Sequence, residues 1–264
     1  MNPTDELYSY LIGLSPLTVA LSGGVDSITL AYFCHVRNIE FKCFTFYGPH
    51  ITAWEISKVQ HFVREYSIPH SFMYIDPLQN HRLLINSRER CYHCKLMLFS
   101  ALGQQAAEDN TIVEGTNSSE LKNYRPGMQA LEELGIVSPF SVLGIDRISV
   151  EQIAQQIMVP QLPAFSRSCL MTRFEYGKHL DRDVLLSIKH AEDHLLHCGI
   201  TGFRIRSLLS GETILQVDPS EYNNFIHCQK TFQHIMNING LYPYSIQVLS
   251  FNRISGYFDY DINS

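Results

Sequence analysis

A loop rich in serine and glycine has the residue types and spacing needed to bind a phosphate group. It reads Ser22-Gly23-Gly24-Val25-Asp26-Ser27 and follows a short apolar run. Two glycines let the backbone turn sharply and approach a ligand closely. Amides and hydroxyls at the start of a helix favour an anion. Asp26 would repel a phosphate unless a cation lay between them, so the loop predicts Mg²⁺ as well. The alternative is a tight turn in which Asp26 or Ser27 caps a helix.

Three cysteines stand where a thiolate would be favoured. Cys91 and Cys94 form a C-x-x-C pair at the expected start of a helix, and Cys169 lies between Arg167 and Arg173. Helix N-termini and cationic neighbours both favour the thiolate form of cysteine.

Three interpretations of these cysteines stay open from the residues alone. Cys169 could be a nucleophile or a sulfur donor. Cys91, Cys94 and Cys169 could instead be three thiolate ligands of an iron–sulfur cluster. All three could also be ordinary buried cysteines. The chain has seven cysteines, and an odd number in a cytosolic protein argues against a disulfide framework.

Alternating strands and helices must position the loop at 22–27 and the C-x-x-C pair. The apolar patterns predict strands at Leu17–Leu21, Phe41–Phe46, Phe72–Ile75 and Ile112–Glu114. Helices are predicted at Val25–Val36, Ala53–Tyr66, Tyr92–Ala107, Met128–Leu134 and Ser149–Ile157. This alternation is typical of a parallel sheet, which binds ligands at the carboxyl ends of its strands.

The pattern changes after about Pro163. Helices are predicted at Asp181–His197 and Glu221–Met236, and strands at Phe203–Leu208, Thr213–Val217 and Ser245–Ser250. We therefore expect an α/β fold: a Rossmann-like parallel sheet domain over 1–165, followed by a smaller α+β domain over 166–264 that carries the sulfur-transfer or substrate site.

The loop at 22–27 resembles the PP-loop of the ATP pyrophosphatase superfamily, also called adenine nucleotide alpha hydrolases. Three further segments narrow the resemblance to the LarE family of sulfur transferases. They are Arg90–Lys95 with Leu98-Phe99, Glu114–Asn117 leading to Tyr124–Gly127, and Cys169-Leu170 with Arg173 and Tyr176-Gly177.

The resemblance implies a specific reaction. LarE proteins use ATP and Mg²⁺ to adenylylate a carboxylate of a pyridinium biscarboxylic acid mononucleotide, and pyrophosphate leaves. A cysteine, here Cys169, then displaces AMP. In some members the cysteine gives up its sulfur and becomes dehydroalanine. In others three cysteines, matched here by Cys91, Cys94 and Cys169, hold a 4Fe-4S cluster that carries the sulfur. The product belongs to nickel-pincer cofactor biosynthesis.

The same resemblance implies a set of site residues. Those expected to bind ATP and pyrophosphate are Ser22, Gly23, Gly24, Val25, Asp26, Ser27, Thr45, Phe46, Gly115 and Thr116. Those expected to bind the substrate or its phosphate are Glu114, Asn117, Arg125, Arg204 and Arg206. The expected catalytic residues are Cys169, Arg173 and Asp26.

The chain departs from the family pattern before the cysteine segment, at position 114 and among the arginines of its C-terminal third. Where the family carries Trp-Asp-Lys-Pro before the cysteine segment, this chain has Leu162-Pro163-Ala164-Phe165, and it has Glu114 where the family has an aspartate. ATP use is therefore the firmer expectation, and the identity of the acceptor is the weaker one.

Composition limits the function classes. The 264 residues are 45% hydrophobic and carry a formal net charge of −6. The acidic balance argues against nucleic acid as a partner, and no apolar run is long enough for a membrane helix. No secretory signal is visible, so a cytoplasmic protein is expected. The resemblance implies a homo-oligomer. Two alternatives stay open: a PP-loop tRNA thiolase with a three-cysteine cluster, and a non-catalytic nucleotide-binding redox module.

Overall fold

The chain forms two compact units. The computed structural model describes residues 3–122, 126–159, 165 and 167–262. The first unit comprises Met1–Tyr47, Ile56–Ile75 and Cys91–Ser166, and the second comprises Gly48–Glu55, Asp76–Arg90 and Arg167–Ser264. Two short segments thus belong to the second unit although they precede residue 166. A division of function between 1–165 and 166–264 stays a prediction.

The first unit is built on a four-stranded parallel sheet in the order β3-β2-β1-β4. Its strands are β1 (Leu17–Ala20), β2 (Phe41–Tyr47), β3 (His70–Tyr74) and β4 (Thr111–Val113). Its helices are α1 (Pro3–Leu14), α2 (Val25–Val36), α3 (Ala53–Glu65), α5 (Arg90–Gln105), α6 (Pro126–Glu133), α7 (Pro139–Val142) and α8 (Arg147–Gln156), with the first residues of α3 and α5 in the second unit. The predicted α/β fold class is confirmed.

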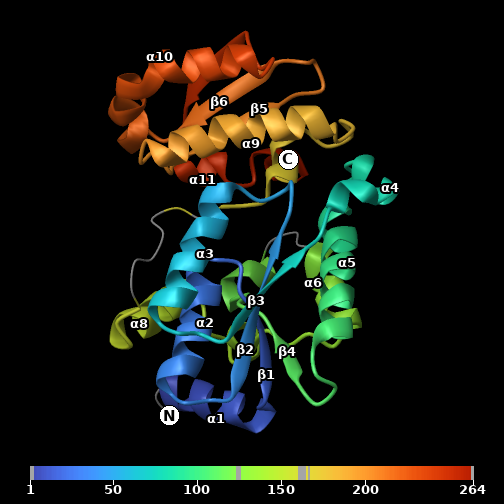
Figure 1. Ribbon diagram of the computed structural model, residues 1–264, viewed down its shortest axis with the longest axis vertical. Coiled ribbons are helices and arrows are strands. Elements are labelled where there is room, and N and C mark those ends of the chain that lie inside the picture. The colour runs from blue at the N-terminus through green and yellow to red at the C-terminus, as the bar shows by residue number, and fades with distance from the viewer. Residues whose placement is uncertain (1–2, 123–125, 160–164, 166, 263–264) are drawn as a thin grey trace. The chain divides into compact units, whose positions relative to one another are not determined.

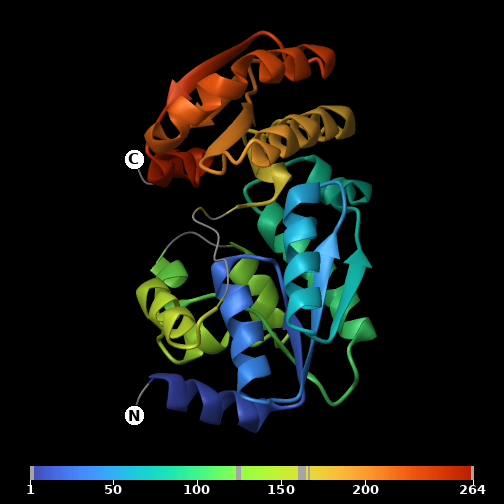
Figure 2. The same ribbon diagram turned by 60° about the vertical axis from the view of Figure 1, so that its left-hand side comes forward.

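Helices cover both faces of this sheet. One core joins residues of α1, α2, α3 and α8, such as Phe33, Phe62 and Val150, to the strands. A second core on the opposite face contains Phe99 and Leu131 from α5 and α6. Figure 1 shows α2, α3 and α8 on one side of the sheet and α5 and α6 on the other. Figure 2 shows α1 at the end of the sheet opposite the carboxyl ends of the strands. The loops that follow β1 and β4, which carry residues 21–24 and 114–117, lie at the carboxyl ends of the strands.

The second unit has a three-stranded sheet in the order β5-β6-β7, where the first pair is antiparallel and the second parallel. Its strands are β5 (Phe203–Ser207), β6 (Thr213–Val217) and β7 (Tyr244–Val248). Its helices are α4 (His81–Leu84), α9 (Arg182–His197), α10 (Tyr222–Ile238) and α11 (Phe251–Ile254), with a short 3-10 helix, η3, at Leu170–Arg173. α9 and α10 pack against each other.

The predicted elements are present with ends shifted by one to a few residues. The third strand shows the clearest shift, because β3 runs over His70–Tyr74 rather than Phe72–Ile75. α1 buries Leu7 and Leu11 against the first core and was not predicted from the sequence. Within the described residues, no helix is long and apolar enough to cross a membrane.

Candidate active site

The glycine-rich loop connects the end of β1 to the start of α2, as predicted. Gly23 has φ +84°, which favours glycine, and Gly24 is the N-cap of α2 without a side-chain capping bond. The Ser27 hydroxyl accepts a hydrogen bond from the Ser22 amide at 3.2 Å and lies 3.0 Å from the Ser22 hydroxyl. These contacts hold the two ends of the loop together. The first amides of α2 have no side-chain cap, and free amides at a helix start can bind an anion.

The chain after β4 lies directly against this helix start. A methyl group built on Gly115 would come 2.8 Å from the Ser27 nitrogen and 3.0 Å from the carbonyl carbon of Asp26. Such distances are too short for any real side chain. Gly115 therefore lets the segment after β4 pack onto the loop, so the structure brings two predicted ATP-binding segments together.

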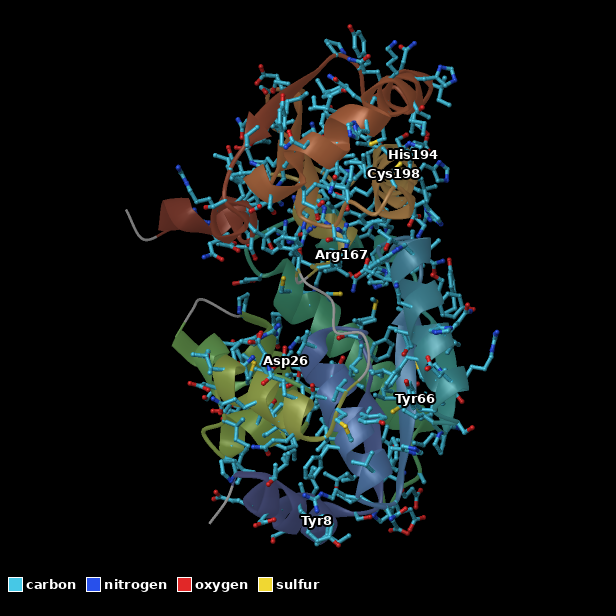
Figure 3. The ribbon with its side chains drawn as sticks, turned by 90° about the vertical axis from the view of Figure 1, so that its left-hand side faces the viewer. Tyr8, Asp26, Tyr66, Arg167, His194 and Cys198 are labelled. Atoms are coloured by element: carbon cyan, nitrogen blue, oxygen red, sulfur yellow. The ribbon has the colours of Figure 1, made fainter. Side chains whose placement is uncertain are left out.

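Asp26 is held by two side chains. Its Oδ1 accepts from Asn117 Nδ2 at 3.2 Å, and its Oδ2 accepts from Arg147 Nη1 at 2.7 Å. Burial raises the pKa of Asp26 and outweighs Arg147 and Asn117, which lower it. The interactions with Arg147 and Asn117 thus do not fully offset the cost of burying the negative charge of Asp26. Figure 3 shows Asp26 at the loop end of α2. Arg147, the first residue of α8, was missed by the sequence analysis.

Glu114 lies at the end of β4 and is almost fully buried. Its carboxylate accepts from the Thr116 amide at 2.9 Å, from the Thr116 hydroxyl at 2.8 Å and from the Ser138 hydroxyl. Lys95 Nζ lies 3.8 Å away. In this structure Glu114 and Thr116 therefore bind each other, and the contacts of Glu114 with a substrate stay a prediction.

Thr45 and Phe46 lie in the last part of β2. The Thr45 hydroxyl donates to the Leu21 carbonyl at 2.6 Å and lies 2.8 Å from His70 Nε2. Phe46 packs edge-on against Phe99 with ring centroids 5.8 Å apart. Their side chains thus brace the sheet next to the loop, and adenine contacts through their backbone groups stay a prediction.

In the second unit, Glu192 of α9 anchors the segment that carries Cys169. Arg173 donates Nε to Glu192 Oε1 at 2.6 Å and Nη2 to Oε2 at 3.0 Å, and Arg167 donates to Oε2 at 2.5 Å. Burial alone would raise the pKa of Glu192, but Arg173 and Arg167 outweigh it and lower the pKa to about 2. The sequence could have indicated Glu192, because this acidic residue lies on the apolar face of α9 with Leu185, Ile188 and Leu195.

Arg204 and Arg206 lie on β5 within reach of the same charges. Arg206 donates to Gln216 Oε1 at 3.0 Å and to the Thr172 carbonyl at 2.8 Å. Burial, followed by repulsion from Arg173, lowers the pKa of Arg206 to about 9, and burial also lowers the pKa of Arg204. Arg204 and Arg206 thus add positive charge near Glu192, whose carboxylate Arg167 and Arg173 bind directly.

Cys169 is half-buried and is the N-cap of η3. Its carbonyl accepts from the Thr172 amide at 3.1 Å and the Thr172 hydroxyl at 2.8 Å. The next residue, Leu170, donates its amide to the carbonyl of His50 at 2.8 Å. The buried imidazole of His50 has no partner for Nδ1 among the described residues. Segment 48–55 therefore helps to position the cysteine, and no pattern in the sequence predicted this contact.

The cysteines expected to hold a cluster belong to different units. Cys91 and Cys94 lie in α5 of the first unit, and Cys169 lies in the second. No group of three or more His, Cys, Asp or Glu side chains able to hold a metal ion occurs in the described part of the chain. The structure thus gives no support to the 4Fe-4S cluster. Arg125 and residues 162–164 lie outside the described residues.

Comparisons with known proteins place the chain among relatives of similar length. No family model matches it. It is 30% identical over 192 residues to an uncharacterized protein of Methanocaldococcus jannaschii, covering 72% of this chain and 73% of that protein. It is 25% identical over 204 residues to pyridinium-3,5-bisthiocarboxylic acid mononucleotide synthase of Lactiplantibacillus plantarum, covering 76% and 74%. The chain belongs to the LarE-like family of PP-loop proteins.

Two other similarities were found. An uncharacterized protein of Synechocystis sp. is 29% identical over 225 residues, or 84% of both chains. The structure of NMN synthetase from Francisella tularensis aligns with a TM-score of 0.45 and 16% identity, covering 60% of this chain and 70% of that one. LarE-like membership rests on the sequence relatives, and the parallel sheet with its glycine-rich loop agrees with it.

Proposed function

We propose that this LarE-like protein is an ATP-dependent sulfur transferase. It adenylylates a carboxylate of a pyridinium dicarboxylate mononucleotide and transfers the sulfur of Cys169 to it, in nickel-pincer cofactor biosynthesis. The observation that carries the proposal is the uncapped start of α2 beside Asp26 and Arg147, since this site has the features of a pyrophosphate cradle. The choice of acceptor follows from the Lactiplantibacillus relative, which is a pyridinium-3,5-bisthiocarboxylic acid mononucleotide synthase, because the corresponding dicarboxylate is the compound that would be thiolated.

In the first step the loop binds the β and γ phosphates of ATP. The amides that begin α2 and the hydroxyls of Ser22 and Ser27 donate to phosphate oxygens. Arg147 supplies a positive charge on the Asp26 side of the loop. The substrate carboxylate attacks the α phosphorus, the bond to the bridging oxygen breaks, and pyrophosphate leaves.

The donor set at the loop fits Mg²⁺. The carboxylate of Asp26 is a hard oxygen ligand, and burial raises its pKa although Arg147 and Asn117 bind it. Asp26 would hold the ion, which supplies neutralisation of the pyrophosphate charge. Asn117 and Arg147 keep the carboxylate oriented.

In the second step the thiolate of Cys169 attacks the acyl carbon, and AMP leaves with the electron pair of its bond to that carbon. The resulting thioester is broken at the Cβ–S bond of Cys169 after loss of the Cα proton, so the acceptor keeps sulfur and dehydroalanine remains. Arg173 holds the cysteine segment through Glu192, Ser168 and Thr172. Arg204 and Arg206 are proposed to bind the acceptor's phosphate.

Intact mass measurement tests this proposal. The full chain is incubated with ATP, Mg²⁺ and the pyridinium acceptor, and the mass is expected to fall by one sulfur and two hydrogens, with the loss located at residue 169. Cys169→Ser should abolish transfer but retain pyrophosphate release. Cys91→Ser is the matched control and should support one turnover like the natural chain.

Two outcomes would contradict the proposal. Pyrophosphate release stimulated by tRNA and not by the pyridinium acceptor would favour a tRNA thiolase. No pyrophosphate release with either acceptor would favour a non-catalytic nucleotide-binding module.

A further inference from the structure

Arg206, to which the proposed function gives the acceptor's phosphate, is covered in this structure and is only 3% exposed. Its Nε donates to Gln216 Oε1 at 3.0 Å, its Nη1 donates to the Thr172 carbonyl at 2.8 Å, and its Nη2 donates to the Ile254 carbonyl. A guanidinium group has five N–H donors. Three of them are thus used, and the other two have no partner among the described residues. Arg206 keeps donors for a ligand that solvent hardly reaches.

Two aromatic rings from one short segment lie over this guanidinium group. The segment is the 3-10 helix η5 (Tyr257–Ile262). The Arg206 Cζ lies 5.5 Å from the centroid of the Tyr257 ring and 5.3 Å from that of the Phe258 ring, which are cation–π distances. Tyr257 and Phe258 are half-buried, whereas Arg206 is buried. The rings therefore form an outer layer that a phosphate would have to displace.

One exposed hydrogen bond ties η5 to the segment that follows Cys169. The Tyr176 hydroxyl donates to Asp259 Oδ1 at 2.6 Å. The Tyr176 ring is held in turn by Arg90, whose Cζ lies 4.4 Å from the ring centroid. A bond to a carboxylate is directional and short, but at an exposed position its net contribution is small because water competes for both partners. This bond can therefore fasten η5 and still be released.

The helix before η5 is anchored independently of it. The Phe251 amide at the start of α11 donates to Asp218 Oδ2 at 2.7 Å, and Ile254 of α11 is fully buried. Gly256 lies between α11 and η5 and has φ +66°, which favours glycine. Because glycine absorbs changes in backbone dihedrals most easily, η5 can turn at Gly256 while α11 stays in place.

We propose that η5 is a hinged cover that must turn away about Gly256 before the acceptor's phosphate reaches Arg206, and that the bond between Tyr176 and Asp259 holds this cover shut. The inference rests on the proposed function, in which Arg206 binds that phosphate. The apparent affinity of a ligand is its affinity for the open form reduced by the fraction of open molecules. The cover therefore weakens binding of the acceptor by the free energy that the closed contacts supply.

Amide hydrogen exchange of the full chain, read by mass spectrometry, tests the opening. The chain is measured alone, with inorganic phosphate, with the pyridinium dicarboxylate mononucleotide, and with the corresponding nucleoside, which lacks the phosphate. Peptides that cover residues 257–262 should exchange faster with the mononucleotide and with phosphate, but not with the nucleoside. Slower or unchanged exchange in these peptides at saturating mononucleotide would overturn the proposal.

Two variants test the latch. Tyr176→Phe keeps the ring and removes the hydroxyl. Exchange over 257–262 should then rise without any ligand, and the Kd for the mononucleotide, measured by calorimetry, should fall about threefold to tenfold, because loss of one exposed hydrogen bond raises the open fraction by that factor. Asp259→Ala should act alike, and the double variant should add nothing to either. Tyr242→Phe, at an exposed position of the same unit, is the matched control and should change neither quantity.

The outcomes separate the cover from the proposed function. Latch variants that bind the mononucleotide as the natural chain does, or more weakly, would contradict the cover while the acceptor stands. If phosphate and the latch variants both speed exchange over 257–262 but the mononucleotide does not bind, the acceptor is wrong and the cover stands. If neither phosphate nor the mononucleotide changes this exchange in the natural chain, η5 is not a cover for any phosphate ligand.

Discussion

Arg173 and Glu192 form a bidentate ion pair in which both side chains are fully buried, with Nε–Oε1 at 2.6 Å and Nη2–Oε2 at 3.0 Å. The same carboxylate accepts from Arg167 and from the Ile205 amide. Glu192 thereby joins α9, β5 and the segment that carries Cys169. One carboxylate is thus the point at which three parts of the second unit meet.

Replacement of this carboxylate should destabilise the second unit strongly. We expect Glu192→Gln to lower the free energy of unfolding by about 3–5 kcal/mol, because removal of one partner leaves buried guanidinium groups uncompensated. Urea unfolding followed by circular dichroism measures it. Glu65→Gln, which removes the exposed partner of His61, is the control and should cost less than about 1 kcal/mol. Equal losses in the two variants would contradict this role.

The same pair predicts how acid affects stability. The folded pKa of Glu192, about 2, lies below its ordinary value of 4.5. A lowered carboxyl pKa stabilises the fold at pH values above 4.5, and that contribution disappears as the pH falls toward 2. Unfolding curves at a series of pH values should therefore be less pH-dependent for Glu192→Gln in this range.

His50 should make the fold weaker between neutral and mildly acidic pH. Burial lowers its pKa to about 4 from the ordinary 6.5, so between these values the unfolded chain binds more protons than the folded one. Stability should fall as the pH decreases through this window, by about 3 kcal/mol from this residue. His50→Gln should flatten that part of the pH profile. His61→Gln, at an exposed position, should leave it unchanged.

Loss of either charge at the phosphate loop should reduce adenylylation. We expect Asp26→Asn to slow pyrophosphate release by about 100-fold and Arg147→Gln by about tenfold to 100-fold, since both act on phosphate charge. A coupled pyrophosphate assay with varied Mg²⁺ measures the effect. Glu151→Gln is the matched control, because Glu151 binds Arg147 at 2.8 Å on its exposed side. A normal rate for Asp26→Asn would contradict the assigned role of the loop.

Addition of a single methyl group at position 115 should disturb the loop. Gly115→Ala places its Cβ 2.8 Å from the Ser27 nitrogen, so the backbone must shift, at a cost of about 1–3 kcal/mol in stability. ATP affinity, measured by calorimetry, should fall with it. Gly103→Ala in α5 meets nothing within 4 Å and should stabilise the chain by about 0.5–1 kcal/mol. If both variants changed stability and ATP affinity in the same way, the close contact between position 115 and the loop would be contradicted.

Local patterns predicted the loop and the strands around it. The strand, glycine turn and helix around residues 17–36 depend on contacts between near neighbours, and the apolar periodicity of the sequence records them. The pairing of Arg147 with Asp26 joins residues 121 apart in the chain. Periodicity holds no information on such pairs, so Arg147 was missed.

The second unit was harder to predict for the same reason. Segment 76–90 joins it through Asn86, whose side chain donates to the Glu175 carbonyl at 2.8 Å and whose own carbonyl accepts from the Gly177 amide. These are contacts of irregular backbone, which no helix or strand pattern reports. The cysteines showed the opposite problem, because the C-x-x-C spacing suggested a cluster without any information about which unit each thiol belongs to.

Gly23 is restricted twice, by its positive φ and by Val59 of α3, whose Cγ2 would lie 2.8 Å from an added methyl group. A smaller residue at 59 would remove the collision but not the backbone strain. Val59 is itself buried in the first core, so position 59 is open only to apolar residues that fit there, and none of these exchanges opens position 23 to another amino acid. Directed evolution of the nucleotide loop should accordingly recover conservative apolar variants at 59 and none at 23.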